Sequence, residues 1–86
     1  MANHKSAIKR ARQNELRRIR NRSVKTRVKS MTKTVEAAVA EKNGDSAAIA
    51  LKAAASVIHK AAKKGVIHKN TAARKVSRLT RMVNTV

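Results

Sequence analysis

The sequence predicts an all-α fold: a three-helix bundle whose long N-terminal helix projects beyond the bundle. The 86 residues include no proline and only two glycines, Gly44 and Gly65. Because glycine favours the position just past a helix end, these two residues divide the chain into three helices, at about 6–43, 46–64 and 70–85. Apolar residues recur at helical spacing in each of them. We expect one small domain, residues 1–86.

The first predicted helix has an apolar face only in its second half. Residues at spacings of 4, 3, 4 and 3 form this face: Val24, Val28, Met31, Val35 and Ala38. Upstream, Ile8, Leu16 and Ile19 are too sparse to form a packing face. A helix over about 6–43 is roughly 55 Å long, whereas a compact domain of this size is about 30 Å across. The N-terminal half of the helix is therefore expected to project.

The second predicted helix lies between two turns. In the turn Asn43-Gly44-Asp45, we expect Gly44 to end the first helix and Asp45 to cap the second. Gly65 is expected to end the second helix. Helical spacing assigns four residues to the core face of this helix: Leu51, Ala54, Ile58 and Ala61.

The third predicted helix has Asn70 as its expected N-cap. Its apolar face again follows spacings of 4, 3, 4 and 3: Ala72, Val76, Leu79, Val83 and Val86. Three such faces are sufficient to close a small bundle with short connections. The core is expected to be thin, because 16 of the apolar residues are alanine and the chain contains no Phe, Tyr or Trp.

Basic residues are concentrated at both ends of the chain, whose formal net charge is +18. Residues 5–33 contain twelve of the 22 lysines and arginines and a single acid, Glu15. On a helix with 3.6 residues per turn, these bases point in all directions. A membrane-surface helix needs an apolar face opposite its basic face, so this segment instead fits a folded polyanion with phosphates on several sides. A solvated or disordered basic tail, or a polybasic import signal, is the alternative for such a charge run.

A second basic segment lies near the C-terminus. At the start of the third helix, Lys69, Asn70 and the backbone amides of Thr71 and Ala72 are candidates for holding a phosphate. His68, just before them, is a candidate hydrogen-bond donor to the same group. Three arginines at spacings of 4 and 3 form one ridge beside the apolar face: Arg74, Arg78 and Arg81.

Catalytic and metal-binding functions find no support in the sequence. The four acids are scattered, and no glycine-rich phosphate loop is present. His4, His59 and His68 match no metal-ligand spacing, and the chain has no cysteine. We therefore predict no enzyme, no cofactor and no metal. Without aromatic residues there are no base-stacking platforms, so contacts to nucleic acid are expected mainly at phosphate and ribose.

Two stretches carry a family resemblance: Met-Ala-Asn-His-Lys-Ser-Ala-Ile-Lys-Arg at 1–10 and Lys-Gly-Val-Ile-His-Lys-Asn-Thr-Ala-Ala-Arg-Lys at 64–75. In these motifs, and in length, charge layout and both glycines, the chain resembles the bacterial small-subunit ribosomal protein S20 family. The middle of the chain matches the family only in the general character of its residues. His4 departs from the aliphatic residue expected at that position. The resemblance implies a three-helix bundle that binds 16S ribosomal RNA directly during subunit assembly, with its long N-terminal helix embedded in RNA.

The residues and the resemblance together predict a structural protein of the small ribosomal subunit in the cytoplasm. Its expected partners are 16S rRNA and other small-subunit components; a membrane and a homo-oligomer are not expected. The alternatives are a histone-like DNA-compacting protein and a membrane-active basic peptide. Fourteen residues are candidates for RNA binding: Lys5, Lys9, Arg10, Arg12, Arg17, Arg18, Arg20, Arg22, Arg27, His68, Lys69, Asn70, Arg74 and Arg78.

Overall fold

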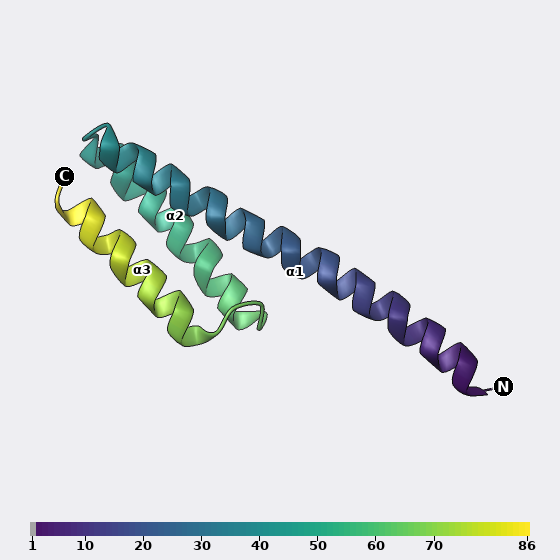
Figure 1. The fold of residues 1–86 in the computed structure, drawn as a ribbon. Helices are drawn as coiled ribbons and strands as arrows, with labels where there is room; N and C mark the ends of the chain where they lie inside the picture. Colours follow the sequence, from purple (N-terminus) through teal and green to yellow (C-terminus); the bar gives the residue numbers. More distant parts are fainter. Residues whose placement is uncertain (1) are drawn as a thin grey trace.

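The computed structural model describes residues 2–86 of the chain, and the side chains from Lys5 onward. These residues form three α-helices, α1 (Ala2–Ala40), α2 (Gly44–Lys63) and α3 (Lys69–Asn84), with no β-strand among them. The helices α2 and α3 lie beside the C-terminal half of α1, whereas the N-terminal half of α1 extends away from them (Figure 1). The predicted all-α bundle with a projecting N-terminal helix is confirmed.

The molecule is long because α1 is longer than the bundle. It measures 63 × 21 × 13 Å and has a radius of gyration of 17.5 Å, whereas a compact domain of this size has a radius of gyration of about 12 Å. The 39 residues of α1 span about 58 Å at 1.5 Å per residue. This helix begins at Ala2 and ends at Ala40, so both ends lie a few residues before the predicted bounds.

The turn between α1 and α2 differs from the prediction. Lys42, not Gly44, adopts the left-handed conformation, with φ 56°. The backbone N–H of Lys42 donates to the carbonyl of Val39 at 2.9 Å, and that of Asn43 donates to Ala38 at 3.2 Å. These two bonds close a Schellman motif on α1. The prediction that Gly44 ends the first helix is therefore wrong, because the turn is complete before Gly44, which is the first residue of α2.

The cap of α2 is Asn43, so the prediction of Asp45 as the cap is also wrong. The side-chain Oδ1 of Asn43 accepts a hydrogen bond from the backbone N–H of Ser46 at 3.1 Å. Asp45 lies in the first turn of α2, where its negative charge suits the positive end of the helix dipole. At the other end, Gly65 has φ 77°, as expected for the glycine that ends α2.

The core is small and is built from one side of each helix. Its buried residues form a single cluster: Val28, Val35, Ala54, Ile58, Ala61, Ala72 and Leu79. Ile58 and Val35 are the largest of the fully buried side chains. All seven residues belong to the predicted apolar faces. The prediction for Val86 is wrong, because α3 ends at Asn84 and Val86 remains 41% exposed; Ala47, which was not predicted, is fully buried.

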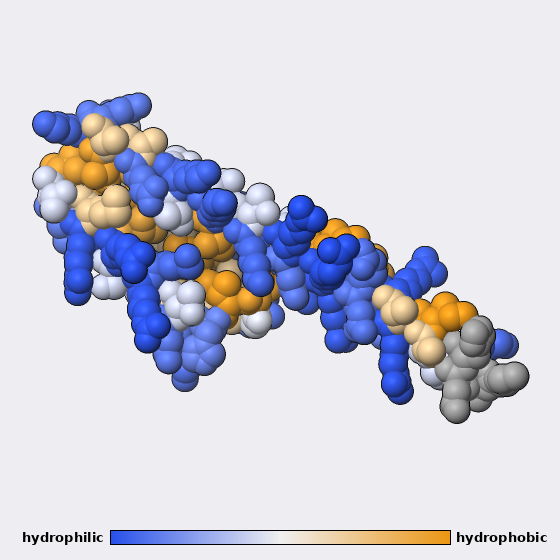
Figure 2. All heavy atoms as spheres, in the orientation of Figure 1, coloured by the Kyte–Doolittle hydropathy of each residue, from blue (hydrophilic) through white to orange (hydrophobic). Residues whose placement is uncertain are grey.

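We call residues 5–23 of α1 the arm. Their side chains are exposed except for Asn21, which is half-buried. The largest exposed apolar side chains of the arm are Ile8, Leu16 and Ile19, each more than half exposed. Figure 2 shows the projecting part of the molecule as a mainly hydrophilic surface interrupted by separate apolar spots. Within residues 2–86, no helix has the length and apolar character needed to cross a membrane.

Candidate nucleic-acid interface

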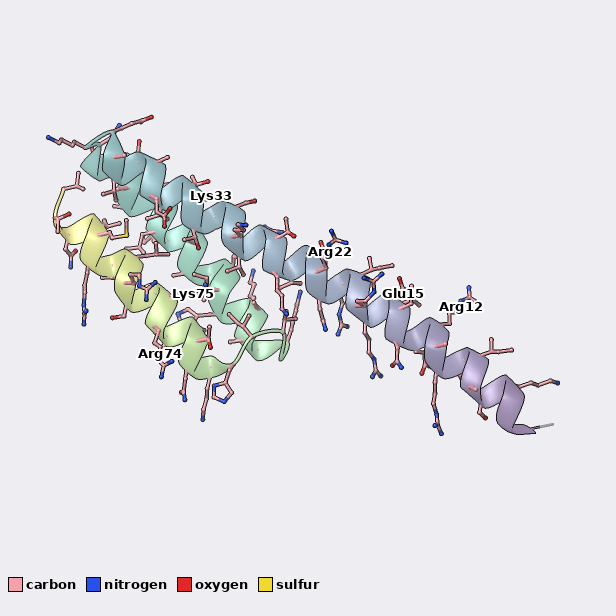
Figure 3. All side chains as sticks on the ribbon, in the orientation of Figure 1. Arg12, Glu15, Arg22, Lys33, Arg74 and Lys75 are labelled. Atoms are coloured by element: carbon pink, nitrogen blue, oxygen red, sulfur yellow. The ribbon has the colours of Figure 1, made fainter. Side chains whose placement is uncertain are left out.

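The arm presents its basic side chains on all sides. In Figure 3 the side chains of α1 project from the rod in several directions, with Arg12 and Arg22 among those labelled. All nine candidate residues on α1 are exposed: Lys5, Lys9, Arg10, Arg12, Arg17, Arg18, Arg20, Arg22 and Arg27. Apart from the half-buried Asn21, the side chains of the arm are exposed, so a ligand has access to most of its circumference.

One of these arginines is already paired within the arm. Arg18 donates two hydrogen bonds to Glu15, from Nη2 to Oε1 at 2.6 Å and from Nε to Oε2 at 3.1 Å. The hydrogen bond and the positive charge of Arg18 hold the pKa of Glu15 below its ordinary value of 4.5. The sequence predicted Arg18 as an RNA-binding candidate without predicting this pair, although the spacing of three residues from Glu15 allows it.

The other bases have no acidic partner. Among the side chains from Lys5 onward, the Glu15–Arg18 pair is the one ion pair formed. The arm therefore keeps nearly all of its charge unneutralised, and such a row of like charges repels itself. Binding a polyanion removes this repulsion and releases the counterions of the polyanion.

The second basic segment is arranged differently from the prediction. His68, not Asn70, caps α3: its Nδ1 accepts the backbone N–H of Asn70 at 3.1 Å. The N–H of Ala72 donates to the carbonyl of His68 at 3.0 Å, so the expectation that this amide is free for a phosphate is wrong. Because Nδ1 is an acceptor here, a neutral His68 carries its proton on Nε2, which remains available to a ligand.

The predicted residues of this segment are accessible to a ligand. His68, Lys69, Asn70, Arg74 and Arg78 are all exposed. Arg74, Arg78 and Arg81 line a shallow depression together with Ala73 and Ser77. Arg74 points outward from the bundle in Figure 3.

The loop between α2 and α3 lies at the end of the bundle from which the arm projects (Figure 1). The α1–α2 turn, which contains Glu41, and the start of α2, which contains Asp45, lie at the opposite end. The structure thus brings His68 and its neighbours to the basic end of the molecule, although it does not join them to the arm as one compact patch.

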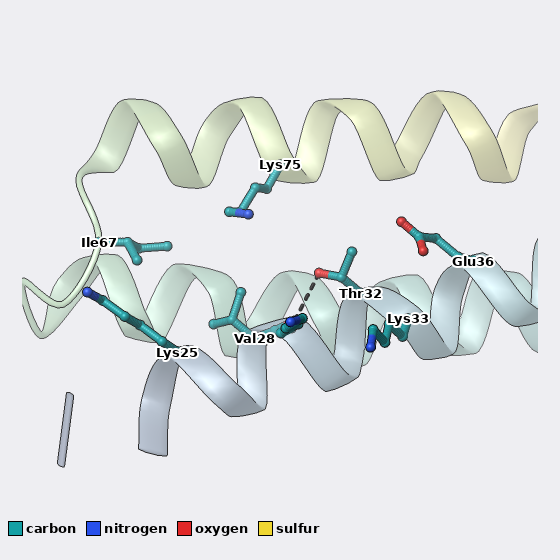
Figure 4. A pocket seen from close by; sticks show the side chains of 8 residues that line it. Lys25, Val28, Thr32, Lys33, Glu36, Ile67 and Lys75 are labelled. Atoms are coloured by element: carbon teal, nitrogen blue, oxygen red, sulfur yellow. Dashed lines mark hydrogen bonds between the residues drawn. The ribbon is translucent and has the colours of Figure 1, made fainter. Parts of the chain in front are cut away.

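A groove between α1 and α3 contains basic residues that the sequence argument did not select. It has a volume of about 510 Å³ and is lined by eight residues: Lys25, Val28, Lys29, Thr32, Lys33, Glu36, Ile67 and Lys75. Figure 4 shows Lys75 reaching from α3 toward α1. Lys25, Lys29 and Lys33 are neighbours on α1 by their spacing of four residues. Only the packing of α3 against α1 brings Lys75 beside them, so sequence spacing alone could not have found the groove.

The described residues contain no group of histidine, aspartate and glutamate side chains that could hold a metal ion. His59 is exposed on α2. His4 was noted as a departure from the resemblance, and its side chain lies outside the described part of the structure.

Comparison with known proteins defines the class to which this basic helical fold belongs. The family model described as ribosomal protein S20 matches residues 2–84. A small ribosomal subunit protein bS20 of Syntrophobacter fumaroxidans is 60% identical over 84 residues, covering 98% of both chains. The bS20 of Nitratidesulfovibrio vulgaris strain Miyazaki F is 60% identical over 86 residues, covering 100% of this chain and 99% of its own.

The chain therefore belongs to the ribosomal protein S20 family. The bS20 of Geobacter sulfurreducens is a further relative, 51% identical over the whole chain. The predicted resemblance is confirmed. This is a family of structural ribosomal proteins of bacteria and not of enzymes, so the predictions of a non-enzymatic ribosomal protein and of a place in the cytoplasmic ribosome are confirmed as well.

Proposed function

We propose that this protein binds 16S rRNA directly in the small ribosomal subunit and stabilises the folded RNA during assembly. The observation that carries the proposal is the arm: an exposed helix, basic on every side, that extends beyond the bundle. A rod of this kind neutralises phosphates from several RNA segments at once, which a basic patch on one face does not. The small-subunit names of its relatives agree with this role.

The bundle and the arm have different tasks in this proposal. The bundle fixes the C-terminal half of α1 through its core and thereby sets the direction of the arm. The arm lies between RNA elements and screens their mutual repulsion. Because its contacts are made by arginine and lysine to phosphate and ribose, recognition depends on the shape of the folded RNA more than on base sequence. We expect the protein to act as a monomer beside other small-subunit components.

Equilibrium binding of the full chain to three ligands tests this function. The ligands are folded 16S rRNA, duplex DNA of equal length in nucleotides and vesicles of anionic lipid, each measured over a salt series. We expect the tightest binding to folded rRNA at physiological salt. Equal affinity for duplex DNA would favour the DNA-compacting alternative, and tight binding to vesicles would favour the membrane alternative; either result contradicts the proposal.

A further inference from the structure

The groove between α1 and α3 combines a basic rim with an apolar floor. Lys25, Lys29 and Lys33 line the groove from α1, and Lys75 lines it from α3. In Figure 4 the side chain of Lys75 extends into the space between these two helices. Val28, which is buried, and Ile67, which is half-buried, form apolar parts of the lining. A sugar–phosphate strand has matching chemistry, because its phosphates carry negative charge and the carbon atoms of its riboses are apolar.

The four lysines of the groove outnumber its single acid, so the lining keeps a net positive charge. Glu36 lines the same groove, yet among the described side chains it forms no ion pair with any of them. The hydroxyl of Thr32 donates to the carbonyl of Val28 at 2.9 Å, so its proton is already used. The groove therefore offers a ligand ammonium groups as its main hydrogen-bond donors, which selects for anions.

The lysines of α1 continue a basic row that starts in the arm. Arg18, Arg22, Lys25, Lys29 and Lys33 follow one another at spacings of 4, 3, 4 and 4 residues, so they lie along one side of α1. Four residues of an α-helix advance about 6 Å along its axis, which is similar to the step between neighbouring phosphates of one strand. A strand held by the arm can thus follow this row into the groove.

We propose that the α1–α3 groove is a second nucleic-acid site, which holds one ribose–phosphate strand of the RNA between Lys29 and Lys75. The inference rests on the proposed function and adds a site on the bundle that the arm does not provide. Phosphates of the strand lie against the lysines of both helices, and riboses lie over Val28 and Ile67. The strand therefore lies along the groove and contacts both α1 and α3.

A matched pair of double variants tests the groove. Lys29→Gln with Lys75→Gln removes two charges from it, and Lys42→Gln with Lys52→Gln removes two exposed charges elsewhere. For the groove variant, we expect the slope of log K against log salt for folded 16S rRNA to become shallower by about 1 to 2. The slope of the control variant should equal that of the parent protein. Thermal unfolding of both variants verifies that the fold is retained.

The outcomes separate the groove from the proposed function. If the parent protein binds folded rRNA and the slope of log K against log salt changes equally in both variants, the groove inference is wrong and the proposed function stands. If the parent protein fails to prefer folded rRNA, the function fails and the groove inference falls with it.

Lysine acetylation in the unmodified full chain gives an independent readout. Bound rRNA should slow acetylation of Lys29 and Lys75 and leave Lys42 and Lys52 as reactive as in the free protein. Equal protection at all four positions would overturn the inference. Equal protection of Lys29 and Lys75 by polyglutamate at the same charge concentration would also overturn it, because an acidic polypeptide would then fit the groove as well as a nucleic-acid strand.

Discussion

The imidazole of His68 caps α3 by accepting the backbone N–H of Asn70 at 3.1 Å. This bond places the start of α3 at Lys69, and Nε2 of the exposed His68 forms no hydrogen bond within the described residues. The two ring nitrogens of His68 thus have different roles. Nδ1 caps α3, and Nε2 is free to contact RNA. The separation of these roles can be measured.

Replacing His68 tests the cap. Loss of an N-cap side chain costs about 1 kcal/mol, so His68→Ala should lower the unfolding midpoint by about 4–8 °C in a domain of this size. His68→Asn restores a strong capping side chain and should recover most of the loss. Thermal unfolding followed by circular dichroism at 222 nm measures both variants. An alanine variant as stable as the parent would show that the cap contributes nothing.

The backbone conformation of Lys42 leads to a second prediction. Its φ of 56° is unfavourable for a residue with a Cβ atom and normal for glycine. Lys42→Gly should therefore stabilise the protein by about 1 kcal/mol. Lys52→Gly removes the same charge within α2 and should destabilise it by about 1 kcal/mol. If urea denaturation showed that both substitutions change the free energy of unfolding in the same direction, the assignment of Lys42 to the left-handed conformation would be contradicted.

The Glu15–Arg18 pair predicts a pH effect on the arm. Because the pKa of Glu15 is lowered in the folded arm, the pair adds stability above the unfolded pKa and loses it as the pH falls through the folded pKa. An NMR titration of the Glu15 carboxyl should give a midpoint below 4.5, and Arg18→Gln should raise that midpoint. A midpoint unchanged by the substitution would show that Arg18 is not the cause.

The core depends strongly on Ile58, which is fully buried in the cluster formed by all three helices. Ile58→Ala should cost about 2–5 kcal/mol, a large share of the stability of a small domain. Ile49 is on the same helix and 71% exposed, so Ile49→Ala should change stability by less than about 0.5 kcal/mol. Chemical denaturation compares the two, and similar losses would mean that the core is elsewhere.

The sequence predicted the helices better than it predicted the turns. The spacing of Val28 and Val35 and of Ala54 and Ile58 located the core, because helical periodicity depends only on the chain itself. In Asn43-Gly44-Asp45, by contrast, each residue is a good turn or cap former, and the hydrogen bonds of the folded turn decide among them. Local propensity therefore led to Asp45 as the cap, whereas the folded turn uses Asn43.

The candidate site shows the same division. The arm was predictable, because its charge and its length are properties of the sequence. The presence of Lys75 in the same groove as Lys29 was not, because it depends on how α3 packs against α1. Ala47 was missed for a related reason: with so many alanines in the chain, burial of any one of them depends on which helix lies opposite.

The salt dependence of rRNA binding by an arm variant tests the central claim most directly. Arg12→Gln with Arg20→Gln removes two exposed charges from the arm, and Lys42→Gln with Lys52→Gln removes two from the bundle. If the arm binds phosphates, the slope of log K against log salt becomes shallower by about 2 for the arm variant and stays at the parent value for the bundle variant. Equal slopes for the two variants would contradict the claim that the arm is the main contact with folded 16S rRNA.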